Sequence, residues 1–272
     1  MWGVLMEFIE YATQFEKMTD NKIVGMPELI DSKINFRGKN NILVCNHDIQ
    51  LKNVVLDFNG NNSIFYVGSN LTDNFRLVIY NNSTGFLGKD CEFGSSVKLQ
   101  IFENKNMIVG DDCVFQDNIF ISNSDGYSFY DSNSKSRINF SNTIYIGDHV
   151  FLGNNVFVSK GVKIGSGSII DNASFIPPYA KIPSNVLVSG NPAKIIKNDI
   201  FFTKDFAGCY NFEDVGYSEN YKSNVFIYEI VNNETLSMDN IDKILADLDV
   251  GDRLDFIQKL FIVNKRKNRF SL

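Results

Sequence analysis

The chain has 272 residues, 44% of them hydrophobic, and a formal net charge of −6. This composition is typical of a globular protein that can bury a sizeable core. The acidic balance argues against nucleic acid as the main partner, because binding phosphates needs a clustered basic face.

Residues 1–32 are expected to form an N-terminal helical cap. Apolar side chains recur there at helical spacing: Trp2, Leu5, Phe8, Ile9, Ala12, Phe15 and Met18. Glutamates stand between them, whereas a helix lying on a membrane would carry Lys and Arg. The segment lacks the basic lead and unbroken apolar core of a signal peptide, and no run of about eighteen apolar residues that could span a membrane occurs in the chain.

Loose repeats with a period of 22 residues begin near Lys33, where segment 36–42 is echoed by 58–64, and 88–93 by 110–115. We interpret each repeat as a solenoid coil of about eighteen residues with about four extra at a corner. Asn recurs at equivalent corners, where it tolerates a left-handed backbone and can ladder with the next coil. The four Cys form no CxxC pair, and Cys91 and Cys113 fall at small inward positions, which favours a reducing cytoplasm.

The repeat is interrupted between Ile121 and Ile144. Residues 122–143 are rich in Ser, Asn and Asp and lack the spacing of the coils. Long loops on a rigid repeat scaffold usually have a function. We therefore expect a protruding loop that takes part in a site, with a flexible insertion as the alternative.

The strongest pattern in the chain has a period of six residues. An aliphatic side chain occupies every sixth position at Ile146, Leu152, Val158, Ile164, Ile170, Ile176, Ile182 and Val188. This period fits neither an α-helix nor an isolated amphipathic strand. It is typical of a parallel β-helix, in which the chain turns a corner after each short strand and three hexads close one coil.

The coils end at Gly190-Asn191-Pro192-Ala193-Lys194, and residues 199–272 form an extension. Residues 200–235 show no regular pattern, whereas 237–248 and 251–265 predict two helices, the first with a Ser cap and an acidic first turn. The basic run 265–269 is interpreted as solvated, with contact to an anionic glycan or lipid surface as the lesser alternative.

Several of these segments resemble the left-handed β-helix (hexapeptide-repeat) acyltransferases, most closely the O-acetyltransferases of capsular and other surface polysaccharides. The resemblance covers roughly residues 33–202 and rests on 124–131, 137–139, 146–153, 160–162 and 190–194. It implies a mainly β fold, with a left-handed parallel β-helix over residues 33–198 between the N-terminal helix and the C-terminal helical extension. It also implies a homotrimer with the site between adjacent subunits.

In this family, a loop His takes the proton of a sugar hydroxyl while the oxygen attacks the thioester of acetyl-CoA. The position of that His is Tyr127 in this chain, and the Trp that lines the acetyl-CoA cleft is replaced by Phe151. A phenol titrates near 10 and an imidazole near 6.5, so Tyr127 would need a nearby cation, such as Lys135 or Arg137, to act as a base. Tyr127 and Asp125 are the candidate catalytic residues, and a packing role is the alternative for Tyr127.

The resemblance also places acetyl-CoA, as the acyl donor, against the last coils. The expected contacts are Phe151, Lys160, Ser174, Lys181 and Lys194, and Lys163 is a further basic candidate. The only two histidines, His47 and His149, are expected to be non-catalytic. Their scarcity excludes the carbonic-anhydrase branch of this fold, which needs three His around a metal, and no metal is expected.

The leading hypothesis is a cytoplasmic O-acetyltransferase that moves an acetyl group from acetyl-CoA to a sugar hydroxyl of a bacterial surface or capsular glycan. The replacement of both His and Trp leaves open a catalytically impaired relative that serves as a glycan-binding or assembly subunit. An acyltransferase for an amino sugar or an amino acid is a third hypothesis, which the loop disfavours. Fold alone does not decide between them.

Overall fold

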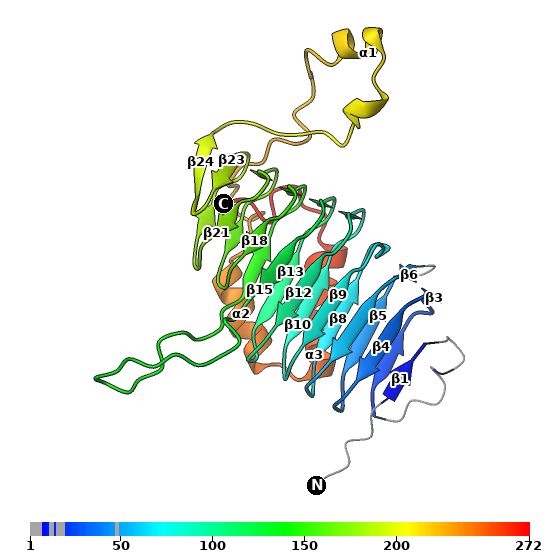
Figure 1. The fold of residues 1–272 in the computed structure, drawn as a ribbon, viewed down its shortest axis with the longest axis vertical. Helices are drawn as coiled ribbons and strands as arrows, with labels where there is room; N and C mark the ends of the chain where they lie inside the picture. The colour runs from blue at the N-terminus through cyan, green and yellow to red at the C-terminus, as the bar shows by residue number, and fades with distance from the viewer. Residues whose placement is uncertain (1–6, 11–13, 15–19, 47–48) are drawn as a thin grey trace.

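The computed structural model describes residues 7–10, 14, 20–46 and 49–272. They form a parallel β-solenoid with three faces (Figure 1). In this part of the chain, the first face consists of β1 (Glu7–Ile9), β4 (Lys33–Phe36), β7 (Val55–Phe58), β9 (Arg76–Ile79), β12 (Lys98–Ile101), β15 (Phe120–Ser122), β18 (Phe157–Val158) and β21 (Phe175–Ile176).

The second face consists of β2 (Lys22–Val24), β5 (Ile42–Cys45), β8 (Ile64–Val67), β10 (Thr84–Leu87), β13 (Asn106–Val109), β16 (Ile144–Ile146), β19 (Lys163–Ile164) and β22 (Lys181–Ile182). The third face consists of β11 (Glu92–Phe93), β14 (Val114–Phe115), β17 (Phe151–Leu152), β20 (Ile169–Ile170), β23 (Leu187–Gly190) and β24 (Ala193–Lys197), with a small separate sheet of β3 (Glu28–Ile30) and β6 (Gln50–Lys52). The pairing is parallel except where β1 meets β4 and β23 meets β24.

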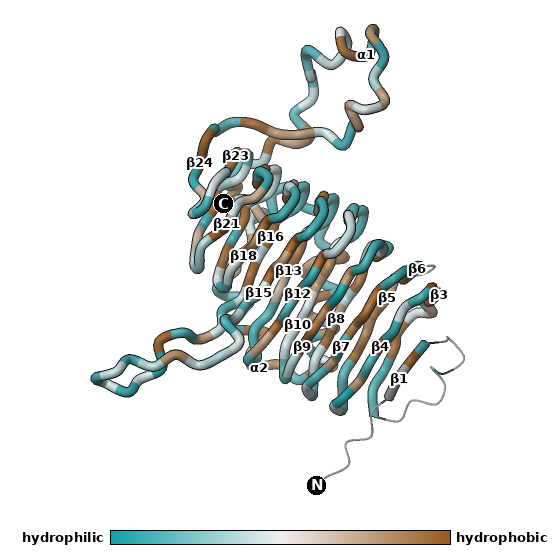
Figure 2. Tube along the Cα trace, viewed as in Figure 1, coloured by the Kyte–Doolittle hydropathy of each residue, from teal (hydrophilic) through white to brown (hydrophobic). Residues whose placement is uncertain are grey.

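The hexad positions line the interior, as the sequence predicts. The side chains from Ile146 to Ile176 at every sixth residue are fully buried, and Ile182 and Val188 are at most 5% exposed. Figure 2 shows the same arrangement as hydrophobic strands that alternate with hydrophilic corners. The predicted parallel β-helix is therefore confirmed, and each coil adds to one continuous core.

The early coils differ from the late ones in their strands and not, as predicted, at their corners. β12 and β13 have four residues each, whereas β18 and β19 have two each. The extra residues of the 22-residue coils therefore lengthen the first and second faces. The predicted Asn ladder is present, because Asn40, Asn62, Asn82 and Asn104 all have positive φ and their amides are hydrogen-bonded in series.

The prediction of an N-terminal helix is wrong at residues 7–9. These residues form strand β1, which pairs with β4 in the antiparallel direction. Pairing on β4 satisfies the edge of the first face, and Ile9 is buried in the interior. Most other positions of that predicted helix, and His47, lie outside the described residues.

The C-terminal extension contains a short 3₁₀ turn (Ala207–Cys209), α1 (Phe212–Tyr217), α2 (Met238–Asp247), α3 (Val250–Ile257) and a π-helical turn (Gln258–Val263). The segments α2 and α3 lie where the sequence predicts helices. The second face is apolar on its outside, where Tyr66, Phe86 and Tyr145 pack against Phe261 and its neighbours in the extension. The extension therefore covers this face.

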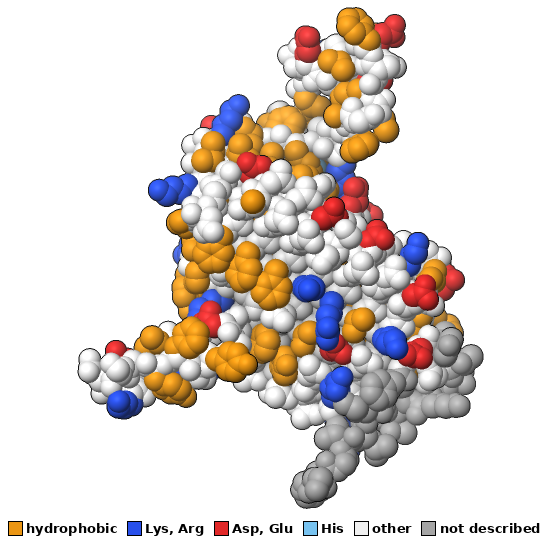
Figure 3. Space-filling view, in the orientation of Figure 1, with side chains coloured by type: hydrophobic (Ala, Val, Ile, Leu, Met, Phe, Trp, Pro, Cys, Tyr) orange, Lys and Arg blue, Asp and Glu red, His pale blue; other side chains and the backbone are white. Residues whose placement is uncertain are grey.

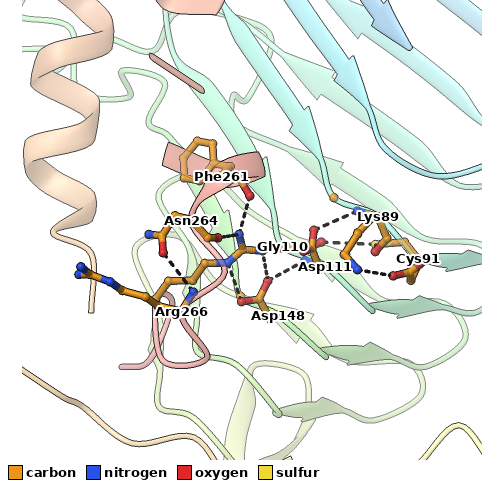
Figure 4. Close-up of polar contacts among 12 residues, drawn as sticks. Lys89, Cys91, Gly110, Asp111, Asp148, Phe261, Asn264 and Arg266 are labelled. Carbon is orange, nitrogen blue, oxygen red and sulfur yellow. Dashed lines mark hydrogen bonds and ion pairs between the residues drawn. The ribbon is translucent and has the colours of Figure 1, made fainter. Parts of the chain in front are cut away.

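Arg269 holds the end of the extension and corrects the interpretation of the basic run as solvated. Its guanidinium is buried and donates to both carboxylate oxygens of Asp148, at 2.7 and 2.9 Å. It also contacts Asp111 at 3.0 Å and the carbonyls of Phe261 and Asn264. Figure 4 labels these three partners together with Asp148. A residue of the extension thus offsets part of the charge of the two solenoid carboxylates.

Candidate active site

The loop over residues 123–143 leaves the corner between β15 and β16 and projects from the solenoid (Figure 1). Its two arms meet at a bridge between Tyr130 and Arg137. The large apolar side chains that it exposes are Tyr127, Phe129, Tyr130, Ile138 and Phe140. A loop that leaves so much aromatic surface in solvent has the properties of a binding element.

Glu103, from the coil before the loop, anchors the base of the loop. It accepts both guanidinium N–H groups of Arg137, at 2.6 and 2.9 Å, and the amide and hydroxyl of Ser141, at 3.1 and 2.7 Å. The hydrogen bond from Arg137 is the main cause that lowers the pKa of Glu103 from 4.5 to about 2. The anchor is therefore ionised at neutral pH.

The Glu103 anchor predicts a pH dependence of loop order. Because the folded pKa lies below the ordinary value, the stabilisation is complete above about pH 4.5 and is lost as the pH falls toward 2. Hydrogen exchange of the Ser141 amide should show protection that decreases over that window, and Glu103→Gln should lose most of it at neutral pH. The amides of β16 are the internal control, and equal Ser141 protection in both proteins would contradict the anchoring role.

Asp125 is held at the inner end of the loop. The Lys160 ammonium and the Asn139 amide, at 2.7 Å, both donate to its Oδ2. Burial raises the pKa of Asp125, but the hydrogen bonds from Lys160 and Asn139 outweigh it and lower the pKa overall. Asp125 is thus a carboxylate at neutral pH, able to accept a proton or a hydrogen bond through Oδ1.

Tyr127 is 83% exposed near the start of the loop. Its carbonyl accepts a hydrogen bond from Asn139 at 2.8 Å, while its hydroxyl has no partner in the described part of the chain. Arg137, expected as a possible activating cation, is instead paired with Glu103. Arg137 is therefore not available to activate Tyr127 in this chain.

Phe151 lies half-buried on the third face, where Phe202 packs edge-on against it at 5.6 Å between ring centroids. His149 is fully buried and stacks between Phe202 and Phe226, at 4.0 and 3.9 Å. Its ring nitrogens contact the Asp112 carboxylate at 2.6 Å and the Phe202 carbonyl at 2.9 Å. His149 thus fastens the extension beside Phe151.

The expected CoA contacts separate into two groups. The Lys160 ammonium is turned inward to Asp125, and Ser174 is buried, with its hydroxyl accepting from the Gly190 amide at 3.3 Å. Neither side chain is available to CoA phosphates in this chain, because each already has a partner within the solenoid. Lys181 on β22 and Lys194 on β24 are exposed and remain candidates.

The described residues contain neither a candidate metal site nor a candidate membrane-spanning helix. No group of three or more His, Cys, Asp or Glu side chains there is arranged to hold a metal ion. No helix in the same part of the chain is long and apolar enough to cross a membrane.

Comparisons with known proteins show which solved structures the chain resembles. Neither a protein-family model nor a curated protein matches the chain. Among solved structures, the polySia-specific acetyltransferase NeuO is 29% identical, with a TM-score of 0.64, over 73% of this chain and 93% of NeuO.

The polysialic acid O-acetyltransferase OatWY is 23% identical over 74% of this chain and 85% of its own, with a TM-score of 0.48. The similarity to NeuO and the hexad-lined solenoid together support the resemblance to the left-handed β-helix (hexapeptide-repeat) acyltransferases.

Proposed function

We propose that the protein is an O-acetyltransferase that moves the acetyl group of acetyl-CoA to a hydroxyl of a bacterial surface glycan. The observation that supports this most is the likeness to NeuO, which extends over nearly all of that protein. Polysialic acid is accordingly the first acceptor to test. A catalytically impaired glycan-binding or assembly subunit is not favoured, because the loop, the solenoid and the turn at residues 190–194 are all retained.

The reaction requires a sugar hydroxyl oxygen to attack the thioester carbonyl, a base to take the hydroxyl proton, and the CoA thiolate to leave. Asp125 is the ionised group that the structure holds at the loop, and Tyr127 stands at the exposed position beside it. We propose that Asp125 orients the acceptor hydroxyl and that Tyr127 takes its proton, while the hydroxyl oxygen bonds to the acetyl carbon, the carbon–sulfur bond breaks and CoA leaves as the thiolate. Phe151 would wall the donor cleft, with Lys181 and Lys194 as the accessible cations for CoA phosphates.

Two apolar stripes support assembly into a trimer. Phe120, Phe157 and Phe175 form a half-buried stack on the first face, with centroids 5.0 and 5.4 Å apart. Figure 3 shows hydrophobic side chains gathered on this face beside the loop. A matching row on the third face consists of Val114, Phe151, Ile169 and Leu187. Two different stripes fit a heterologous contact, and a rotation that closes such contacts makes a ring.

We therefore expect light scattering to give about three times the chain mass of 30.8 kDa at micromolar concentration. Phe157→Glu should shift the protein toward a monomer, because a charge in the buried stripe is left unpaired. Lys52→Glu, an exposed change away from the stripes, is the control. A monomer mass for the unmodified protein would contradict the trimer.

The proposed activity is tested by following CoA thiol release with polysialic acid, with neutral polysaccharides and without acceptor. Release that depends on polysialic acid supports the proposal. Release that is the same with and without every acceptor would show hydrolysis only, and no release would favour the non-catalytic alternative.

A further inference from the structure

We propose that the corner between the first and second faces is a binding groove for an extended saccharide chain, leading to the base of the loop. The inference rests on the proposed function, because it names where the acceptor polymer lies. It goes further in assigning recognition to a part of the solenoid that lies outside the loop and the donor cleft.

The groove consists of two adjoining hollows that share Glu103, Asn104 and Lys105. One, of about 460 Å³, is lined by Tyr80, Phe102 and the loop residues Arg137, Phe140 and Ser141. The other, of about 600 Å³, runs along the Asn corner and is walled by the turn between α2 and α3, over residues 245–253. The shared residues make the hollows one path from the early coils to the loop.

The floor of the second hollow is a ladder of amides. Asn40, Asn62, Asn82 and Asn104 are joined from Nδ2 to Oδ1 at 2.8, 3.1 and 3.0 Å. The two inner amides, of Asn62 and Asn82, each use one of two N–H groups and one of two oxygen lone pairs to bind their neighbours. One donor and one acceptor per residue stay available, repeated at the coil spacing of about 4.8 Å. A row of evenly spaced donor–acceptor pairs suits a polymer that bears hydroxyls.

The other hollow offers flat apolar surface. Tyr80 and Phe102 stack with centroids 4.7 Å apart, and Phe140 is 60% exposed with the Arg137 guanidinium 4.9 Å from its ring. The C–H faces of pyranose rings pack on such surfaces, while polar groups beside them fix orientation. Glu103 is already neutralised by Arg137, so Lys105 leaves the groove open to an acidic sugar as well as a neutral one.

The test compares two matched double variants. Asn82→Gly with Asn104→Gly removes two ladder amides at positions of positive φ, where Gly fits the backbone. Asn118→Gly with Asn155→Gly removes an equivalent amide pair, joined at 3.3 Å, from the corner between the third and first faces. The first variant loses two ladder bonds and the control loses one, and both gain two glycines, so the thermal stability of each is measured beside its affinity.

Binding is measured by calorimetry with sialic acid oligomers of increasing length, and KM and kcat are measured with the same oligomers. We expect affinity to rise with oligomer length in the unmodified protein. In the first double variant, Kd and KM for long oligomers should rise about tenfold, the change expected when two neutral hydrogen bonds are lost. Its kcat, and its Kd and KM for short oligomers, should change little. The control variant should behave like the unmodified protein.

Affinity that does not depend on length, or an equal loss in both double variants, would overturn the groove. The calorimetric readout separates this outcome from failure of the proposed function. Length-dependent binding without acetyl transfer would support the saccharide groove and contradict the proposed acetyltransferase activity. Acetyl transfer without length-dependent binding would support the activity and contradict the groove.

Discussion

The double variant Tyr127→His with Phe151→Trp is expected to transfer acetyl groups at neutral pH about 10²–10⁴-fold faster than the unmodified protein, the usual effect of a positioned general base. Tyr127 is exposed and its hydroxyl has no partner in the described residues, so an imidazole can enter without breaking a side-chain contact. Trp at the half-buried position 151 restores an N–H donor to the proposed wall of the donor cleft. The rate is measured as kcat with saturating acetyl-CoA and polysialic acid.

Two single variants control this experiment. Tyr127→Phe should abolish the activity of the unmodified protein, because Phe lacks only the hydroxyl. Phe151→Trp alone should change the KM for acetyl-CoA more than kcat. Fast turnover by the unmodified protein, with the same kcat in Tyr127→Phe, would contradict a role for Tyr127 and leave Asp125 as the next candidate base.

Arg269→Ala should destabilise the protein by about 3–5 kcal/mol, the usual cost of removing one partner of a buried ion pair. The change leaves Asp148 buried without its bidentate partner and removes donors from the carbonyls of Phe261 and Asn264. The midpoint of guanidinium unfolding measures the effect. Lys265→Ala, an exposed position in the same basic run, is the control. Equal midpoints for the two variants would show that the extension is held by its apolar contacts alone.

The interior of the solenoid was predictable because it depends only on local spacing. Each hexad carries its own large and small inward residue, so Ile146 to Val188 reveal their burial without knowledge of the rest of the chain. The placement of the extra residues in the early coils was not predictable in the same way. A period of 22 does not tell whether a strand or a corner has grown; the strand lengths decide it, four residues in β12 and β13 and two in β18 and β19.

The site was predictable where a motif marks it and not where distant segments meet. The resemblance supplies Tyr127, Asp125 and Phe151 as candidates, whereas the pairing of Asp125 with Lys160 joins residues 35 positions apart across the interrupted repeat. The stacking of His149 between Phe202 and Phe226, and the pairing of Arg269 with Asp148, involve an extension without any repeat. An Arg at the end of a basic run has no sequence signal that separates burial from exposure.

O-acetylation of polysialic acid can be tested directly by incubating the purified protein with acetyl-CoA and the polymer and recording the NMR spectrum of the recovered polymer. We expect new O-acetyl ester signals on the sugar that require both the protein and acetyl-CoA. These signals should grow faster with the Tyr127→His and Phe151→Trp double variant. A polymer that stays free of acetyl esters with both proteins, under conditions in which each is folded and binds CoA, would contradict it.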